Sequence, residues 1–168
     1  GGVAPYNYIW NNGMTSKEIR EVPAGKYIAS VSDANNCIST LETYVTQPTE
    51  LIKTIDAITD IRCNGDSTGS IQVTVREGVP PYSFEWNTGA TTEDIRGIVA
   101  GNYKLTITEA NGCKSILEAN VEEPPAFFAS IDNITNIQCF GNTTGAIDVS
   151  VSGGITPYKF AWSNGSTS

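Results

Sequence analysis

The sequence contains no histidine, and its four cysteines include no C-x-x-C pair. Histidine is the commonest general base in enzymes, so the Ser-His-Asp and Cys-His catalytic arrangements are excluded. A carboxylate pair is the remaining route to catalysis, but the acidic residues that recur along the chain are scattered over different predicted elements. We therefore expect a protein that is not an enzyme and has no catalytic residues.

Positive charge is also scarce. The chain has 10 Lys and Arg residues against 18 Asp and Glu residues, which gives a formal net charge of -8. A surface that binds phosphates needs clustered Lys and Arg, so we expect no nucleic acid partner. Charged residues make up only 17% of the chain, while Gly, Thr, Ser and Asn are plentiful. This composition is typical of a β protein with short strands and many turns.

Long apolar runs are missing as well. No stretch approaches the ~20 apolar residues that a membrane-spanning helix needs, and no signal-peptide pattern is present. We therefore expect no direct membrane insertion by this segment.

What the sequence does contain is a repeated phrase. GGVAPYNYIWNNG at residues 1–13 returns as EGVPPYSFEWNTG at 77–89 and as GGITPYKFAWSNG at 153–165. The step is a constant 76 residues, without insertion or deletion. Because the chain starts inside one repeat and stops at the equivalent point two repeats later, we interpret it as a piece of a longer protein.

A repeat of ~76 residues is long enough to bury a small core of its own, unlike the shorter units of solenoids. With Pro48 and Pro124 as punctuation, residues 1–48 are the C-terminal part of one repeat, 49–124 a complete repeat and 125–168 the N-terminal part of a third. We expect tandem domains arranged as a rod, in which neighbouring repeats are the first partners of each unit.

Alternation of apolar and polar residues predicts an all-β unit. Six or seven short strands fit an immunoglobulin-like β-sandwich. The strands are expected near residues 51–61, 70–75, 82–86, 94–99, 102–109 and 113–121.

Aromatic residues are expected to form the core of this sandwich. Tyr82, Phe84 and Trp86 are spaced by two and share one face, and the Asn-Thr-Gly that follows predicts a hairpin turn between antiparallel strands. The phrase A-G-N-Y places Tyr103 where a tyrosine corner would bond its hydroxyl to nearby backbone; the alternative is a tyrosine that only fills core space.

These motifs together resemble a known family. The motifs are CNGDSTGSI at 63–71, GVPPYSFEWNTG at 78–89, AGNY at 100–103 and TEANGC at 108–113. They resemble the SprB repeat, found in very large cell-surface adhesins of gliding Bacteroidetes and in related proteins secreted by the type IX system. The chain departs from the family pattern at Asn36, Glu109 and Phe140.

The resemblance implies an extracellular protein at the cell surface whose repeats form a long filament used in gliding motility and adhesion. It also adds a modification: Asp66-Ser67-Thr68 matches the short acidic motif for O-glycosylation at Ser67 in that phylum. The alternative interpretation of this tripeptide is a polar turn.

Two cysteines per repeat without histidine fit disulfides better than zinc, and disulfides indicate an oxidising, extracellular setting. We predict a Cys63–Cys113 bridge within one unit, closing a loop of about fifty residues and contributing ~3–4 kcal/mol. The alternative within the chain pairs Cys37 with Cys63 and Cys113 with Cys139. A strict immunoglobulin topology would place Cys63 and Cys113 at opposite poles. An unusual path of the first strand, or bridges between neighbouring units, would resolve this.

Calcium is the cofactor considered, because acidic extracellular β modules bind it through loop carboxylates. Asp60, Asp66 and Glu109 are the candidate donors. Ordinary turn residues are the favoured interpretation, since Asp60 and Asp66 become Asn136 and Asn142 in the next repeat. Other recurring acids are interpreted as solvated surface charges: Glu18 with Asp94, Asp33 with Glu109, Glu42 with Glu118, and Asp56 with Asp132.

Two functions are compatible with these features of the sequence. The units are either spacers that hold an adhesive tip away from the cell, or weak binding modules for polysaccharide or other surface proteins that gain avidity from copy number. Sugar-binding sites present flat aromatic faces to solvent, whereas the alternation here buries the aromatic residues. The spacer is therefore the favoured function.

Overall fold

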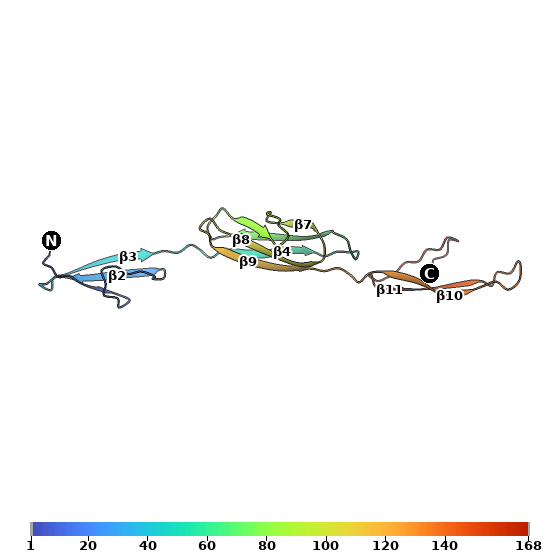
Figure 1. Ribbon diagram of the computed structural model, residues 1–168, viewed down its shortest axis with the longest axis horizontal. Coiled ribbons are helices and arrows are strands. Elements are labelled where there is room, and N and C mark those ends of the chain that lie inside the picture. The colour runs from blue at the N-terminus through green and yellow to red at the C-terminus, as the bar shows by residue number, and fades with distance from the viewer. Residues whose placement is uncertain (1, 168) are drawn as a thin grey trace. The chain divides into compact units, whose positions relative to one another are not determined.

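The computed structural model describes residues 2–167, and every regular element in this range is a β-strand, as expected for an all-β protein. The chain divides into two compact units, the first ending at Thr49 and the second beginning at Glu50. Figure 1 shows the strands of each unit. Within residues 2–167 no helix is long and apolar enough to cross a membrane. The repeat boundaries at Pro48 and Pro124 stay predictions.

The first unit is a single antiparallel sheet in the order β1-β2-β3. Its strands are β1 (Asn7–Trp10), β2 (Gly25–Ser32) and β3 (Ile38–Val45).

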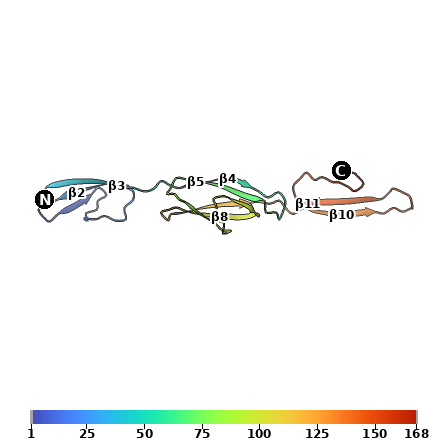
Figure 2. The same ribbon diagram turned by 90° about the horizontal axis from the view of Figure 1, so that it is seen from above.

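The complete repeat that follows consists of two three-stranded sheets. The first has the order β4-β5-β7, and the second has the order β6-β8-β9. Seen from above, β4 and β5 lie on one side of this repeat and β8 on the other (Figure 2). The strands are β4 (Ile52–Thr59), β5 (Gly69–Arg76), β6 (Ser83–Trp86), β7 (Ile95–Ile98), β8 (Gly101–Thr108) and β9 (Lys114–Val121).

The last part of the chain forms one two-stranded sheet of β10 (Phe128–Thr135) and β11 (Ala146–Ser152). Its register reproduces that of β4 and β5, including a bulge between Ile131 and Asn133 that corresponds to the bulge between Ile55 and Ala57. The β2–β3 register likewise reproduces that of β8 and β9. The strand pairs of the partial repeats therefore have the same register as their counterparts in the complete repeat.

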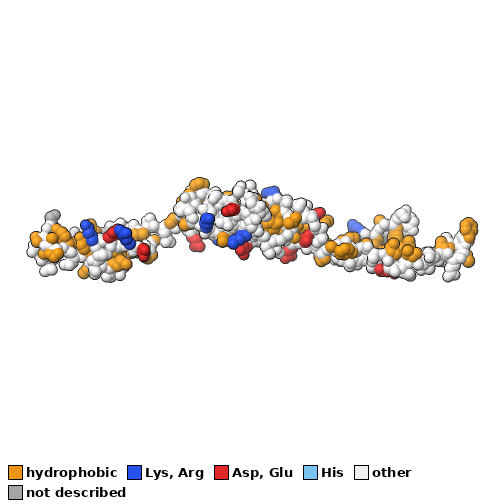
Figure 3. All heavy atoms as spheres, in the orientation of Figure 1, with side chains coloured by type: hydrophobic (Ala, Val, Ile, Leu, Met, Phe, Trp, Pro, Cys, Tyr) orange, Lys and Arg blue, Asp and Glu red, His pale blue; other side chains and the backbone are white. Residues whose placement is uncertain are grey.

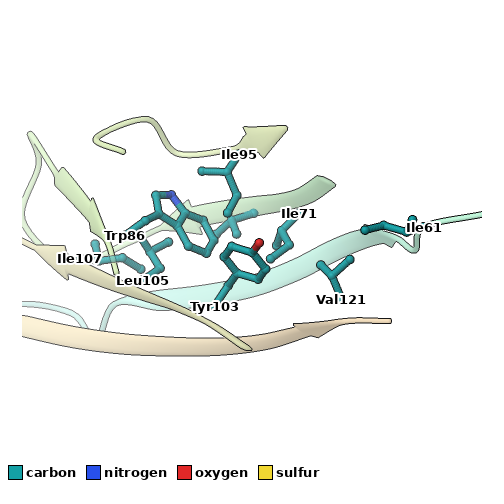
Figure 4. Close-up of a cluster of buried hydrophobic side chains, with 9 residues drawn as sticks. Ile61, Ile71, Trp86, Ile95, Tyr103, Leu105, Ile107 and Val121 are labelled. Carbon is teal, nitrogen blue, oxygen red and sulfur yellow. The ribbon is translucent and has the colours of Figure 1, made fainter. Parts of the chain in front are cut away.

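One hydrophobic core lies between the two sheets of the complete repeat. Ile71 and Val73 of β5 pack against Leu105 and Ile107 of β8, and Figure 4 shows these sheets' side chains pointing toward one another. Alternation along β5 and β8 places every second residue in this core, as the sequence predicted for residues 70–75. The buried cluster consists of Ile61, Ile71, Val73, Trp86, Ile95, Tyr103, Leu105, Ile107 and Val121.

The predicted aromatic face is confirmed in part. Trp86 is 2% exposed and belongs to the buried cluster, whereas Tyr82 and Phe84 are half-buried and pack against it. Glu85, on the opposite face of the same strand, is exposed.

The tyrosine corner is confirmed. The Tyr103 hydroxyl donates to the Val99 carbonyl at 2.8 Å, and in the first unit the Tyr27 hydroxyl donates to the Pro23 carbonyl at the same distance. Both rings are buried, so each residue also fills core space. The bond fixes the strand entry because it ties the start of β8, or of β2, to the segment four residues upstream.

The expected hairpin after Trp86 is wrong. The turn itself forms, with Gly89 at φ 87° and its N–H donating to the Trp86 carbonyl at 2.9 Å. However, β6 pairs with β8, and the chain crosses after the turn to β7, which pairs with β5 in the other sheet. Trp86 stabilises the segment that crosses between the sheets, because its indole N–H donates to the Thr92 carbonyl at 2.8 Å.

Replacing Ile71 by Ala should lower the free energy of unfolding of the complete repeat by about 2–5 kcal/mol, because Ile71 is fully buried between the sheets. The same substitution at Ile116, which is 47% exposed on β9, should cost about 0.5 kcal/mol or less. Urea unfolding followed by Trp86 fluorescence measures both, with Trp10 and Trp162 replaced by Phe. Equal losses would show that the sheets do not share this core.

Candidate functional site

The chain leaves the complete repeat through a segment that is bonded to the β4–β5 loop. The buried Ile61 donates its N–H to the Glu122 carbonyl at 2.9 Å, and the Glu122 N–H donates to Asp60 Oδ1 at 2.8 Å. Ile61 belongs to the core cluster, so these two bonds tie the exit segment directly to the packed interior.

Two further hydrogen bonds extend this connection toward the following repeat. The Asn64 side-chain amide donates to the Pro124 carbonyl at 3.0 Å, and the Gly65 N–H donates to Glu123 Oε2 at 2.7 Å. A carboxylate acceptor makes the second bond a strong one. We call this set the exit clamp; it joins Asp60, Ile61, Asn64 and Gly65 to Glu122, Glu123 and Pro124.

At the opposite end of the repeat, a carboxylate holds the loop that precedes β6. The Val79 N–H donates to Glu109 Oε2 at 2.6 Å, and the Ala110 N–H donates to the Val79 carbonyl at 3.0 Å. A Cβ at Gly78 would collide with the Glu109 carboxylate, and φ there is 65°, so a side chain at this position would displace the carboxylate and strain the backbone. Glu109 therefore fastens the β8–β9 turn to the loop before β6.

The first unit repeats this arrangement with a shorter acid. Asp33 Oδ2 accepts the Val3 N–H at 3.1 Å, while Oδ1 accepts the N–H groups of Asn35 and Cys37, each at 2.9 Å. Asp33 is only 8% exposed. The interpretation of Asp33 and Glu109 as solvated surface charges is wrong, because both carboxylates satisfy backbone donors.

Hydrogen bonds from backbone N–H groups lower the pKa of Asp33. The bond from Val3 has the largest effect, followed by that from Cys37, and burial opposes them. These donors favour the charged carboxylate over the protonated acid. The pKa of Asp56 is lowered chiefly by its hydrogen bond from the Thr74 hydroxyl and then by that from Thr54.

Two more carboxylates cap the edge of β5. β7 pairs only with the start of β5, and beyond it Asp94 Oδ1 accepts the Val73 N–H at 3.0 Å while Glu93 Oε1 accepts the Val75 N–H at 3.2 Å. Unpaired N–H groups on a strand edge are a template for pairing with another strand, and negatively charged caps block it. Asp94 is thus a further recurring acid with a structural role.

The three calcium candidates do not come together. Asp60 and Asp66 lie in the β4–β5 loop beside the end of β9, whereas Glu109 bonds at the start of β9. Asp60 and Glu109 already accept backbone N–H groups. Within the described residues, no three His, Cys, Asp or Glu side chains form a group that fits a metal ion. The preference for ordinary turn residues over calcium stays a prediction.

The predicted Cys63–Cys113 bridge is wrong for this fold. All four cysteines are unpaired and exposed. Cys113 directly precedes β9, whereas the loop holding Cys63 is bonded to the segment just after β9. Eight strand residues at about 3.3 Å each separate the two thiols by roughly 26 Å, far beyond the ~7 Å limit between the Cα atoms of a disulfide. The sequence-based objection about opposite poles was correct.

Exposed flat aromatic faces are not found on the complete repeat. Its four aromatic residues, Tyr82, Phe84, Trp86 and Tyr103, are all buried or half-buried. The exposed Phe127 and Phe128 lie just beyond it, and the Phe127 ring contacts Tyr158. The surface of the complete repeat therefore lacks the stacking platform that a sugar-binding site uses.

Ser67, the predicted glycosylation site, lies exposed in the β4–β5 loop. Its attachment to a sugar stays a prediction.

A family model described as the SprB repeat matches residues 55–91 and 131–167. Each matched segment runs from within the first strand of a repeat to just past the aromatic turn, and the two lie 76 residues apart. This confirms the resemblance seen in the motifs. The SprB repeat is a cell-surface adhesin repeat, which indicates an extracellular location. No curated protein matches the chain.

The carboxyl group of Asp33 should titrate below its ordinary value of 3.8. A lowered folded-state pKa means that Asp33 stabilises the first unit at pH values above about 4, and that this contribution is lost as the pH falls through the folded-state value. A ¹³C NMR titration of the side-chain carboxyl measures this pKa. Replacing Val3 by Pro removes one N–H donor and should move the midpoint back toward 3.8. A wild-type midpoint at or above 3.8 would contradict the bonding described.

Replacing Cys63 by Ser should shift the Tm of the complete repeat by less than about 4 °C, the shift that ~1 kcal/mol produces in a domain of this size. A bridge to Cys113 would contribute ~3–4 kcal/mol and its loss would shift the Tm several times further. Calorimetry of the air-oxidised protein measures the shift. Peptide mapping without reductant should recover no peptide that joins Cys63 to Cys113.

Proposed function

Because residues 55–91 and 131–167 are SprB repeats, we propose that this chain is a structural repeat segment of a very large cell-surface adhesin. It acts there as a stalk or filament in gliding motility and surface adhesion. The family supports the surface location, and type IX secretion from a member of the Bacteroidetes follows from the same resemblance. Neighbouring repeats of the same chain are the principal partners of each unit.

In this proposal each 76-residue repeat is an immunoglobulin-like sandwich, and the repeats follow one another as a rod. Two sheets around one core, and a buried tyrosine bonded to backbone four residues upstream, support the sandwich. Proline at the junctions restricts the backbone between repeats and so limits bending. No catalytic step is assigned, since the chain has no histidine to act as a base.

The observation that carries the spacer function is the path of the chain through the complete repeat. β4, which begins the repeat, and β9, which ends it, run in the same direction and contact each other. Near their starts, the Lys53 ammonium contacts the Ser115 hydroxyl, and beyond their ends, Ile61 bonds to Glu122. The chain therefore enters at one end of the repeat and leaves at the other.

This path determines how a stretching force acts on the bonds of the repeat. A pull on the two junctions acts along β4 and β9 in opposite senses, so the Lys53–Ser115 contact near their starts and the Ile61–Glu122 bond beyond their ends are both loaded in shear. The exit clamp lies just after β9, where a force on the following junction first reaches the folded repeat. The bond from the Ile61 N–H to the Glu122 carbonyl transmits this force to the hydrophobic core. A unit built in this way suits a stalk.

The alternative is that each repeat is a weak binding module for polysaccharide or for other surface proteins. Copy number would then supply avidity. None of the four aromatic residues of the complete repeat is exposed, since two are buried and two half-buried, and this favours the spacer over the alternative.

Replacing Asp60 by Ala should weaken the complete repeat under tension, because the Glu122 N–H of the exit clamp loses its acceptor. Loss of ~1–2 kcal/mol raises the unfolding rate at constant force about 5- to 30-fold. Force spectroscopy on the chain tethered at both ends measures this rate. Asp66→Ala is the matched control, because it is the same change at an exposed residue of the same loop that is not part of the exit clamp. Equal rates for the two variants would contradict the role of the clamp.

A folded chain of several repeats should show no saturable binding to a panel of bacterial and environmental polysaccharides and abiotic surfaces, with or without calcium. Surface plasmon resonance on chains of two, four and eight repeats measures this. Saturable binding that rises steeply with repeat number would contradict the spacer function and support the multivalent binding module.

A further inference from the structure

Asparagine is followed by glycine at four places in the chain. The pairs are Asn12-Gly13, Asn64-Gly65, Asn111-Gly112 and Asn164-Gly165. Such an asparagine is chemically labile, because the backbone nitrogen of the next residue can attack its side-chain carbonyl carbon and glycine has no Cβ to hinder the approach. Each of these glycines has a φ between 84° and 86°, and no atom beyond its chain neighbours lies within 4 Å of the place a Cβ would take.

Three of the four pairs share one turn geometry. The glycine N–H donates to the backbone carbonyl three residues earlier at 2.9 Å, from Gly13 to Trp10, from Gly112 to Glu109 and from Gly165 to Trp162. In each turn the asparagine Oδ1 accepts the N–H of the residue after the glycine, at 3.0–3.2 Å. The acceptor of the glycine N–H is thus a neutral carbonyl oxygen, which is too weak a base to take the proton.

The pair in the exit clamp differs. The Gly65 N–H donates to Glu123 Oε2 at 2.7 Å, and the Asn64 side-chain amide donates to the Pro124 carbonyl at 3.0 Å. A carboxylate at this distance from an N–H has the geometry of a general base. Asn64 and Glu123 are both exposed, so water reaches them, and Figure 3 shows Asp and Glu side chains at the surface of the complete repeat.

We propose that Asn64 is a site of spontaneous deamidation in which Glu123 acts as the general base. The Gly65 nitrogen forms a bond to Asn64 Cγ while Glu123 takes the proton of the N–H. The bond from Cγ to Nδ2 then breaks, and Nδ2 leaves as ammonia with the proton that Glu123 returns. Water opens the resulting cyclic imide at one of its two carbonyls and leaves aspartate or isoaspartate.

The base distinguishes Asn64 from the other three asparagines. In every pair the asparagine side chain has to break one exposed hydrogen bond before the ring closes, to Pro124 at Asn64 and to a backbone N–H in the other turns. This cost is similar in all four pairs. The glycine N–H is bonded to a carboxylate only at Gly65 among these four.

Deamidation would change the exit clamp irreversibly. Aspartate has no N–H to donate to the Pro124 carbonyl, and it adds a negative charge beside Glu123. Isoaspartate also adds a carbon atom to the backbone and so displaces the Gly65 N–H from its acceptor. The chemistry is independent of the stalk, but its effect under tension rests on the proposed function. Phe140 stands at the equivalent position of the next repeat, so the reaction has no counterpart there.

Incubation of the folded chain at mildly alkaline pH, followed by peptide mapping with mass spectrometry, tests the proposal. Asn64 should be converted at least about tenfold faster than Asn111, since a positioned general base contributes this much or more. In denaturant the base is no longer held at the Gly65 N–H, and the two rates should converge. This comparison removes the effect of the local sequence.

Two glutamine variants test the role of the base. Glu123→Gln retains an oxygen acceptor but no base, so the rate at Asn64 should fall to that at Asn111, with Asn111 itself unchanged. Glu122→Gln is the matched control, because the backbone of Glu122 takes part in the exit clamp and its side chain does not, and the rate at Asn64 should stay at the wild-type value. Equal rates at Asn64 and Asn111 in the folded wild type, or an unchanged rate in Glu123→Gln, would overturn the proposal.

Force spectroscopy on the deamidated chain separates the modification from the stalk function. The deamidated repeat should unfold faster at constant force than the fresh protein, because the bond to Pro124 is lost. An unchanged unfolding rate would contradict the role of this bond under tension, whereas the conversion measured by peptide mapping would still establish the site.

Discussion

The structure depends on one constraint: each sheet of a repeat is apolar on a single face, and only the other sheet of the repeat can cover it. Ile71 and Leu105, from opposite sheets, are both fully buried in the complete repeat. Burial of apolar area is the dominant favourable term in folding, so the packing of the two sheets against each other supplies most of the stabilisation of the complete repeat.

Carboxylates accept hydrogen bonds from backbone N–H groups that strand pairing leaves without a partner. Backbone N–H groups at the poles and along the edge of a sandwich have no strand partner, and leaving them unsatisfied is costly. Asp60, Glu109 and Asp94 each accept such a donor, at the exit, at the entry and at the edge of β5 respectively. This explains part of the acidic character of the protein.

The proposed function follows from connectivity, and no single residue carries it. A stalk needs units that pass tension from one junction to the next, and the complete repeat offers two strands of the same direction joined at both ends. The exit clamp is the most sequence-sensitive part of this device, because Asn64, which bonds to the junction, is replaced by the fully exposed Phe140 in the next repeat. Phe140 has no side-chain amide, so it cannot make the bond that Asn64 makes to Pro124.

The sequence by itself determined the repeat length, the all-β class, the strands and the tyrosine corner, because periodicity and short motifs are local properties. Tertiary structure decided the rest. The crossing of strands between the two sheets decides that β6 pairs with β8 and not with β7. It also sets the ~26 Å between Cys63 and Cys113. Alternation along one strand carries no information on which sheet the next strand joins. The roles of Asp33 and Glu109 were missed for the same reason. A carboxylate looks identical in sequence whether it faces water or a backbone N–H brought to it by the packing of two sheets.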